Sequence, residues 1–232
     1  MGRLGIRPTP LAFLRPPAVE TVTSFRVGFP LAAEGALFSL IYILLTRVVT
    51  AFGTPAVAAL GVGHKLEVLN YFVCAGMGAA ATTLVGQNLG AGDSRRAVRC
   101  AWRTLFLTCL PVGAVTILLV TFPEVAIEVF SRDVGVISAG ATYVLLVGLT
   151  QLFMAAEVMM LGAFAGAHWT AVPATIEIGL TALRVPLAMW LVGRGWGVEA
   201  VWFAIASTTV VKGTLLAALF GSRFGRGRTH NV

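Results

Sequence analysis

Long apolar stretches separated by short polar turns run along almost the whole chain. Each stretch exceeds 20 residues, which is enough to cross a bilayer as a helix. In lipid every backbone polar group must be satisfied within the protein, so a helix is the expected state. The runs are continuous, whereas the strands of a transmembrane barrel would alternate. Six membrane spans are therefore expected, at residues 27–51, 56–84, 102–122, 136–161, 170–192 and 198–220.

Clusters of glycine, proline and aspartate separate these stretches and predict turns between them. The turn signals lie at residues 53–55, 90–93, 123 with 132–133, 166–169 and 193–197. The pattern predicts an all-α membrane protein with a bundle of six transmembrane helices over residues 24–222. We expect residues 1–23, which contain several prolines and arginines, to be a cytoplasmic linker or leader, and residues 223–232 to be a basic cytoplasmic tail.

The composition agrees with a membrane location and sets the orientation. Hydrophobic residues make up 57% of the chain and charged residues 12%, about half the charged fraction of a soluble domain. If six helices alternate, eleven of the 17 Lys and Arg residues fall on one side and three on the other. The positive-inside rule then predicts that both termini face the cytoplasm. In a chain this hydrophobic, the net charge of +7 is explained by positive charges on one side of a membrane. We therefore expect a multi-pass protein of the cell membrane, with lipid rather than nucleic acid as its partner.

One acidic residue, Glu34, is the leading candidate for function. An ionised side chain inside a membrane costs roughly 2.5–3.5 kcal/mol to insert, so such residues are candidate sites. Glu34 follows Arg26 by eight residues, which is about 12 Å along a helix. Pro30 lies between them and favours a bend, because it cannot donate a backbone hydrogen bond. A carboxylate beside a bent helix suits cation or proton binding, although a structural hydrogen bond to another helix is the alternative.

A second group of polar residues is expected to line a cavity. His64 and Glu67 are three residues apart, and Glu67 and Tyr71 are four apart, so each pair shares a helix face. His64 and Glu67 lack a third ligand at helical spacing, so no metal site is expected. The cavity candidates are His64, Glu67, Asn70, Tyr71, Gln151, Glu177 and Arg184.

Other charged residues within the spans have different expected roles. Glu177 and Arg184 are seven residues apart, or about 10 Å along the helix, so each needs a partner on another helix. We expect Glu157 to reach the membrane interface. We expect Lys212 to extend its ammonium group toward the headgroups along an apolar stem.

Sequence motifs of soluble enzymes are absent. The chain contains no GxSxG, HExxH, GxxxxGK[ST] or paired CxxC pattern. No enzyme activity and no cofactor are expected.

The run Val85-Gly86-Gln87-Asn88-Leu89-Gly90-Ala91-Gly92-Asp93 resembles the multidrug and toxic compound extrusion (MATE) family of transporters. Further segments resemble the same family in the same order, over roughly residues 24–220. They are Gly28-Phe29-Pro30 followed by Glu34, Thr46-Arg47, Phe52-Gly53, Ala58-Ala59, residues 151–157, Arg184-Val185-Pro186-Leu187-Ala188, and residues 196–202.

This resemblance implies one lobe of a two-lobed transporter. Family members have two six-helix lobes around a central cavity and export organic, often cationic, compounds in exchange for sodium ions or protons. The chain resembles the C-terminal lobe, with Glu34 at the acidic position used for cation or proton coupling. Thr150 and Met154 stand where sodium-dependent members carry Tyr and Asp. The implied partners are an organic small-molecule substrate and either the missing N-terminal lobe or a second copy of the chain.

Two alternatives remain at this point. A flippase for lipid-linked precursors, from the same superfamily, would need a strongly basic cavity, for which only Lys65, Arg184 and Lys212 are available. A membrane subunit or fragment that transports nothing is the other alternative.

Overall fold

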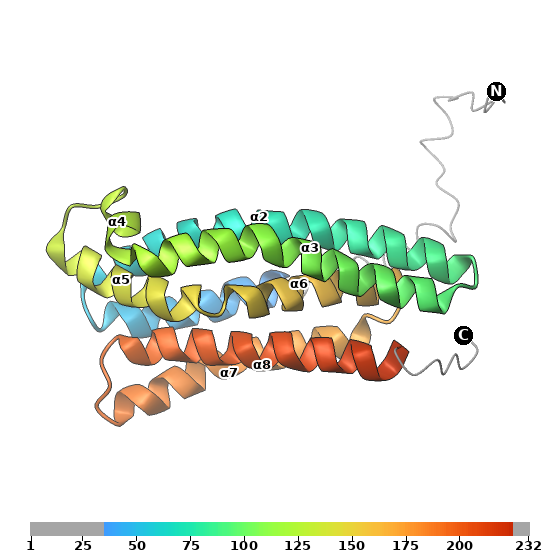
Figure 1. The fold of residues 1–232 in the computed structure, drawn as a ribbon. Helices are drawn as coiled ribbons and strands as arrows, with labels where there is room; N and C mark the ends of the chain where they lie inside the picture. Colours follow the sequence, from blue (N-terminus) through green and yellow to red (C-terminus); the bar gives the residue numbers. More distant parts are fainter. Residues whose placement is uncertain (1–34, 225–232) are drawn as a thin grey trace, which may run out of the picture.

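The computed structural model describes residues 35–224, and their secondary structure is helical, with no strand among them (Figure 1). The first described helix is Gly35–Thr50. It is followed by α2 Thr54–Gly90, α3 Ser94–Thr121, α4 Pro123–Glu128, α5 Val134–Gly148, α6 Gln151–Gly166, α7 Ala171–Gly193 and α8 Glu199–Phe224. This arrangement confirms the predicted all-α fold. Glu34 and the predicted linker lie outside the described residues, as does nearly all of the predicted tail.

The long helices run side by side and form one elongated bundle (Figure 1). The most extensive contacts join α2 to α3, α5 and α6, and α8 to α6 and α7. Four helices are long and apolar enough to cross a membrane, and a fifth span results if the bent pair α5–α6 counts as one. The helix Gly35–Thr50 is also apolar but shorter, and the predicted first span, residues 27–51, begins outside the described residues.

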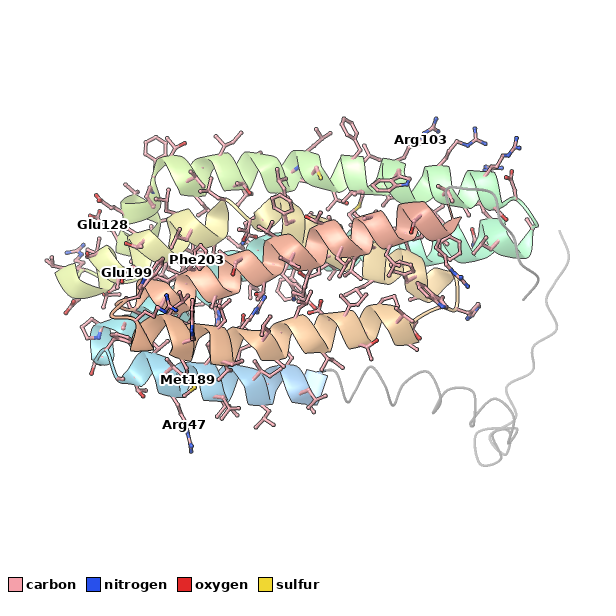
Figure 2. All side chains as sticks on the ribbon, turned by 90° about the horizontal axis from the view of Figure 1, so that it is seen from below. Arg47, Arg103, Glu128, Met189, Glu199 and Phe203 are labelled. Atoms are coloured by element: carbon pink, nitrogen blue, oxygen red, sulfur yellow. The ribbon has the colours of Figure 1, made fainter. Side chains whose placement is uncertain are left out.

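Charged side chains mark the two ends of the bundle. Arg47, Glu128 and Glu199 lie toward one end, while Arg103 lies toward the other (Figure 2). The connection between α2 and α3 and the last turn of α8 are at the same end as Arg103 (Figure 1). The predicted cytoplasmic arginines of α3 and α8 therefore lie at one common end.

The helix boundaries follow the turn residues seen in the sequence. Gly53 has a φ of 93° immediately before α2, and Gly92 has a φ of 77° between α2 and α3. Glycine tolerates this left-handed region because it has no Cβ. Asp93 then caps α3, since its Oδ1 accepts a hydrogen bond of 2.8 Å from the backbone N–H of Arg96.

The predicted span 136–161 is not one straight helix, so this part of the prediction needs correction. The helices α5 and α6 meet at an angle of 53°. At the break, the Val147 carbonyl accepts hydrogen bonds from the backbone N–H and the Oγ1 of Thr150, at 3.0 and 2.8 Å. The Gln151 amide also donates to this carbonyl, at 3.5 Å. Side-chain donors thus add to a backbone hydrogen bond at this one carbonyl, where the regular helix is interrupted.

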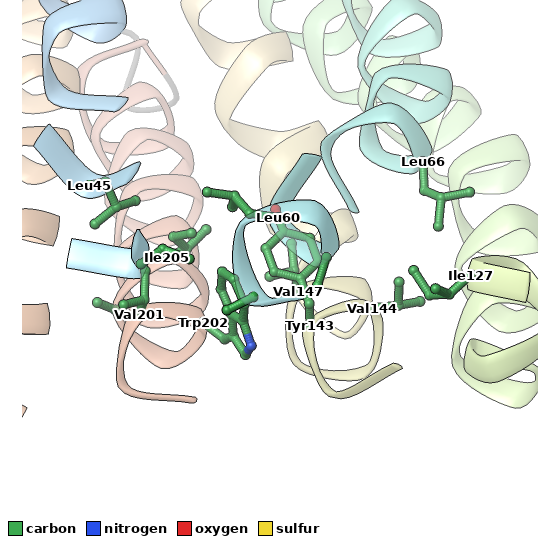
Figure 3. Packing of buried hydrophobic residues seen from close by; sticks show 14 of the residues in the cluster. Leu45, Leu60, Leu66, Ile127, Tyr143, Val144, Val147, Val201, Trp202 and Ile205 are labelled. Carbon is green, nitrogen blue, oxygen red and sulfur yellow. The ribbon is translucent and has the colours of Figure 1, made fainter. Parts of the chain in front are cut away.

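Apolar side chains form one cluster toward each end of the bundle. Figure 3 shows the first cluster, where the Tyr143 and Trp202 rings pack edge to face with centroids 4.8 Å apart. The second cluster is centred on Phe164 and Phe220. Buried polar side chains, among them Glu157, Arg184 and Lys212, come from the helix segments between these clusters.

Candidate functional site

Arg184 on α7 joins its own helix to two others inside the bundle. Its Nε donates to Thr208 Oγ1 at 2.9 Å and its Nη2 to Thr209 Oγ1 at 3.0 Å, both on α8. Its Nη1 donates to the Tyr42 hydroxyl at 3.1 Å, on the helix Gly35–Thr50. The side chain is buried, and the guanidinium donates on three sides. The prediction that Arg184 needs partners on other helices is confirmed.

Substitution R184K is expected to lower the free energy of unfolding by about 2 kcal/mol, because a single ammonium group cannot replace the planar fork. The matched control is R194K, since Arg194 is exposed and stacks on Trp190 with 4.2 Å from its Cζ to the ring centroid. Reversible unfolding in mixed micelles, followed by circular dichroism, measures both variants. Equal stabilities for the two would contradict a structural role for the Arg184 fork.

His64 and Glu67 lie on one side of α2, next to Arg184 and its partner Tyr42. The Tyr143 hydroxyl donates to Glu67 Oε1. The His64 ring lies 4.8 Å from the Tyr42 ring and 6.1 Å from the Tyr143 ring, centroid to centroid. His64 Nε2 is buried and has no hydrogen-bond partner among the described residues. The expected shared face of His64 and Glu67 therefore packs against aromatic residues of two other helices.

Asn70 and Gln151 form a second polar contact, between α2 and α6. The Asn70 amide donates to Gln151 Oε1 at 3.2 Å, and both side chains are buried. Gln151 is the first residue of α6, immediately after the break. The bend therefore positions this predicted polar residue against α2.

The third polar group contains Glu177 and is centred on Lys212. The sequence predicted another role for Lys212. Lys212 is only 1% exposed. Its Nζ lies 2.7 Å from Glu157 Oε1 and 2.6 Å from Glu177 Oε1. We call Lys212, Glu157 and Glu177 the triad. The prediction that Lys212 extends to the headgroups is wrong, and so is the prediction that Glu157 reaches the interface.

One sequence signal could have identified Lys212. Thr208 and Lys212 are four residues apart in α8 and share a face of an otherwise apolar helix, with Thr209 alongside. A polar stripe of this kind normally faces protein in a membrane bundle. Taken together, Thr208, Thr209 and Lys212 would have predicted that the Lys212 side chain is buried.

Tyr71 is the predicted cavity residue that the structure places apart from the others. Its side chain is 48% exposed, although Glu67 four residues earlier is turned toward Tyr143. Lys65, which follows His64 on α2, is also exposed, and its Nζ lies 6.0 Å from the centroid of the Phe130 ring. Tyr71 and Lys65 thus lie on the surface of the described bundle.

Hollows on the surface of the bundle lie away from these polar groups. One has a volume of about 490 Å³ and lies at the end of the bundle near α4; the other, of about 360 Å³, lies on α3. The first is lined by Val125, Glu128, Val129, Arg132 and Ile137, and the second by Trp102, Arg103, Phe106 and Leu107. Within the described residues, the polar groups therefore connect helices and line neither hollow.

Comparison with known protein families gives one matching model, MatE, over residues 30–190. A probable multidrug resistance protein NorM of Thermotoga maritima is 30% identical over 200 residues, which cover 84% of this chain and 42% of that protein. A protein of the same name from Chromobacterium violaceum is 30% identical over 211 residues, covering 88% of this chain and 44% of the relative. The chain thus spans less than half the length of these relatives.

Solved structures show the same fold. An outward-facing multidrug resistance MATE family transporter of the MOP superfamily superposes with a TM-score of 0.82 and 17% identity, over 91% of this chain and 48% of that one. An inward-facing transporter of the same description superposes with a TM-score of 0.81 and 16% identity, over 93% and 51% of the two chains. The bundle therefore has the fold of about half of such a transporter.

Proposed function

Because this chain belongs to the MATE family of transporters, we propose that it forms one half of an exporter of organic, often cationic, compounds. The observation that carries the proposal is the alignment of nearly the whole chain with less than half of relatives named as multidrug resistance proteins. Export would proceed in antiport with protons or sodium ions and would need no cofactor. The half-exporter would be a multi-pass protein of the cell membrane, with both termini in the cytoplasm.

The other half would be either a separate N-terminal lobe or a second copy of this chain. Large apolar side chains on the described surface are available to contact lipid or that partner, among them Ile43 and Phe72. Cross-linking in native membranes tests the two alternatives. Cross-linked pairs of this chain would support the second copy, whereas monomers alone would exclude it.

Alternating access by rocking of the two halves is the mechanism that we propose. The same half-fold matches transporters in inward-facing and outward-facing conformations, as expected if each half moves as one body. Hydrogen bonds from Arg184 and ion pairs from Lys212 connect helices on several sides of the bundle. The substrate would bind between the halves, where exposed side chains such as Tyr71 are accessible.

Glu34 is the proposed coupling residue, on the basis of its acidic character and its position after Pro30 in a family-like segment. It would bind a proton or a sodium ion from outside and release it inward. Moving one charge through ~100 mV provides ~2.3 kcal/mol, and an ion gradient adds to this.

Substitution E34Q is expected to abolish gradient-driven export, because an amide can neither bind and release a proton nor carry a charge. The experiment uses vesicles that contain the chain together with the complementary half, or the chain alone if it pairs with itself. Export of a cationic dye such as ethidium is followed after a proton or a sodium gradient is imposed. The matched control is E124Q, since Glu124 is exposed.

Two results would count against the proposal. Unchanged export by E34Q would remove Glu34 from coupling. Absence of export in every combination of halves would instead favour a subunit that transports nothing. The flippase alternative predicts phospholipid-like cargo, but Arg184 and Lys212 are already bonded inside the bundle and are poorly placed to bind a phosphate.

A further inference from the structure

The triad in the bundle interior has a charge imbalance. Three helices contribute to it: Glu157 from α6, Glu177 from α7 and Lys212 from α8. Glu157 and Glu177 are only 8% and 7% exposed. Two ionised carboxylates and one ammonium group have a net charge of −1, which is costly to bury unless it is compensated.

Within residues 35–224, no cation other than Lys212 forms an ion pair with Glu157 or Glu177. Thr181 accepts from Lys212 Nζ at 3.2 Å and donates to Glu177 Oε1 at 3.2 Å, and it carries no charge. Arg184 on α7 is within electrostatic range, but its three hydrogen bonds go to Tyr42, Thr208 and Thr209. Among residues 35–224, the Tyr42 hydroxyl and the Cys74 thiol on α2 also lie within electrostatic range of Glu157, and the Cys109 thiol on α3 lies beside Cys74.

Each carboxylate of the triad has one oxygen without a partner. Glu157 Oε2 and Glu177 Oε2 are buried and form no hydrogen bond among the described residues, while both Oε1 atoms contact Lys212. Buried carboxylate oxygens without donors are rare. Adding a proton to one Oε2 would provide a donor and would bring the net charge of the triad from −1 to zero.

We propose that the Lys212–Glu157–Glu177 triad is a proton-binding site that takes up one proton per chain and does not bind sodium. The proton comes from a hydronium ion in solution: one O–H bond of hydronium breaks, which leaves water, and an O–H bond forms with a free carboxylate oxygen. Two carboxylates in one site commonly share a proton, which then belongs to the pair and not to either residue.

The position of Lys212 explains the choice of a proton over a metal cation. The ammonium group already lies between the two Oε1 atoms, where a cation bridging the carboxylates would lie. Within residues 35–224, no three His, Cys, Asp or Glu side chains converge as metal ligands. The triad as defined does not include Glu34, and proton binding to the triad does not require that the chain transport anything.

The test is infrared difference spectroscopy of the full chain in lipid nanodiscs between high and low pH, using the C=O stretching band of protonated carboxylic acids. In E157Q and in E177Q, one carboxylate remains with Lys212 as a neutral pair. Each variant is therefore expected to lose the signal of about one carboxyl group per chain relative to the unmodified protein. The matched control E128Q removes an exposed carboxylate and is expected to keep the signal of the triad.

A third variant tests the same prediction in the opposite direction. In K212M the two carboxylates lose their cation, so the same band is expected to increase. An unchanged band in E157Q and E177Q, or in K212M, would overturn the proposal.

Loss of the band when sodium chloride replaces choline chloride would overturn the preference for a proton. E34Q is expected to leave the signal of the triad in place, which separates this result from a failure of transport.

Discussion

Substitution K212M is expected to destabilise the bundle by about 3–5 kcal/mol, because it leaves two buried carboxylates without their cation. Lys212 Nζ contacts Glu157 and Glu177 at 2.7 and 2.6 Å, and methionine has a similar length but no charge. The three helices that carry the triad would lose a shared contact near the middle of the bundle. The free energy of unfolding in mixed micelles measures the effect.

Two further variants show whether the loss comes from unpaired charge. K65M removes an exposed lysine of α2 and is expected to change stability little. K212M combined with E157M and E177M replaces all three charged side chains with apolar ones of similar length, and such a replacement is often neutral or stabilising. A K212M protein as stable as K65M would show that the triad does not stabilise the bundle.

Substitution G162A is expected to destabilise the bundle by about 1–3 kcal/mol through overpacking. A Cβ at Gly162 would collide with the Gly78 carbonyl of α2, which is backbone and cannot rotate away. Thr82 reinforces this close approach, since its Oγ1 donates to the Gly162 carbonyl at 2.8 Å. Small residues that let backbones approach closely are a main source of helix association in lipid. The same micelle unfolding experiment measures the loss.

G76A is the matched control, because a Cβ at Gly76 of α2 would meet no atom within 4 Å. It adds the same methyl group to a helix and is expected to be neutral or slightly stabilising. G213A tests the same mechanism on α8, where a Cβ would collide with the Phe153 backbone of α6. If G162A and G213A were as stable as G76A, the close packing of α6 would not contribute to stability.

Local signals in the sequence were sufficient to predict the helices and where they end. Continuous apolar runs predict helices because lipid leaves the backbone no other partner. Glycine and aspartate at the turns predict where the helices end, as Gly92 and Asp93 show between α2 and α3. The family-like run ending at Asp93 also placed the chain among transporters before any fold was known, and the matching family model confirms it.

The pairing of polar side chains was decided by the tertiary structure. Lys212 is 55 residues from Glu157 and 35 from Glu177, and helical periodicity predicts only which face a residue occupies. Which helices meet, and at what height, depends on packing across the whole bundle. The contact between Gln151, just after the break, and Asn70 on α2 joins residues 81 positions apart, so the periodicity of an apolar run did not reveal it. The sequence alone therefore determined the helices and their ends, whereas three-dimensional packing determined which buried charges meet.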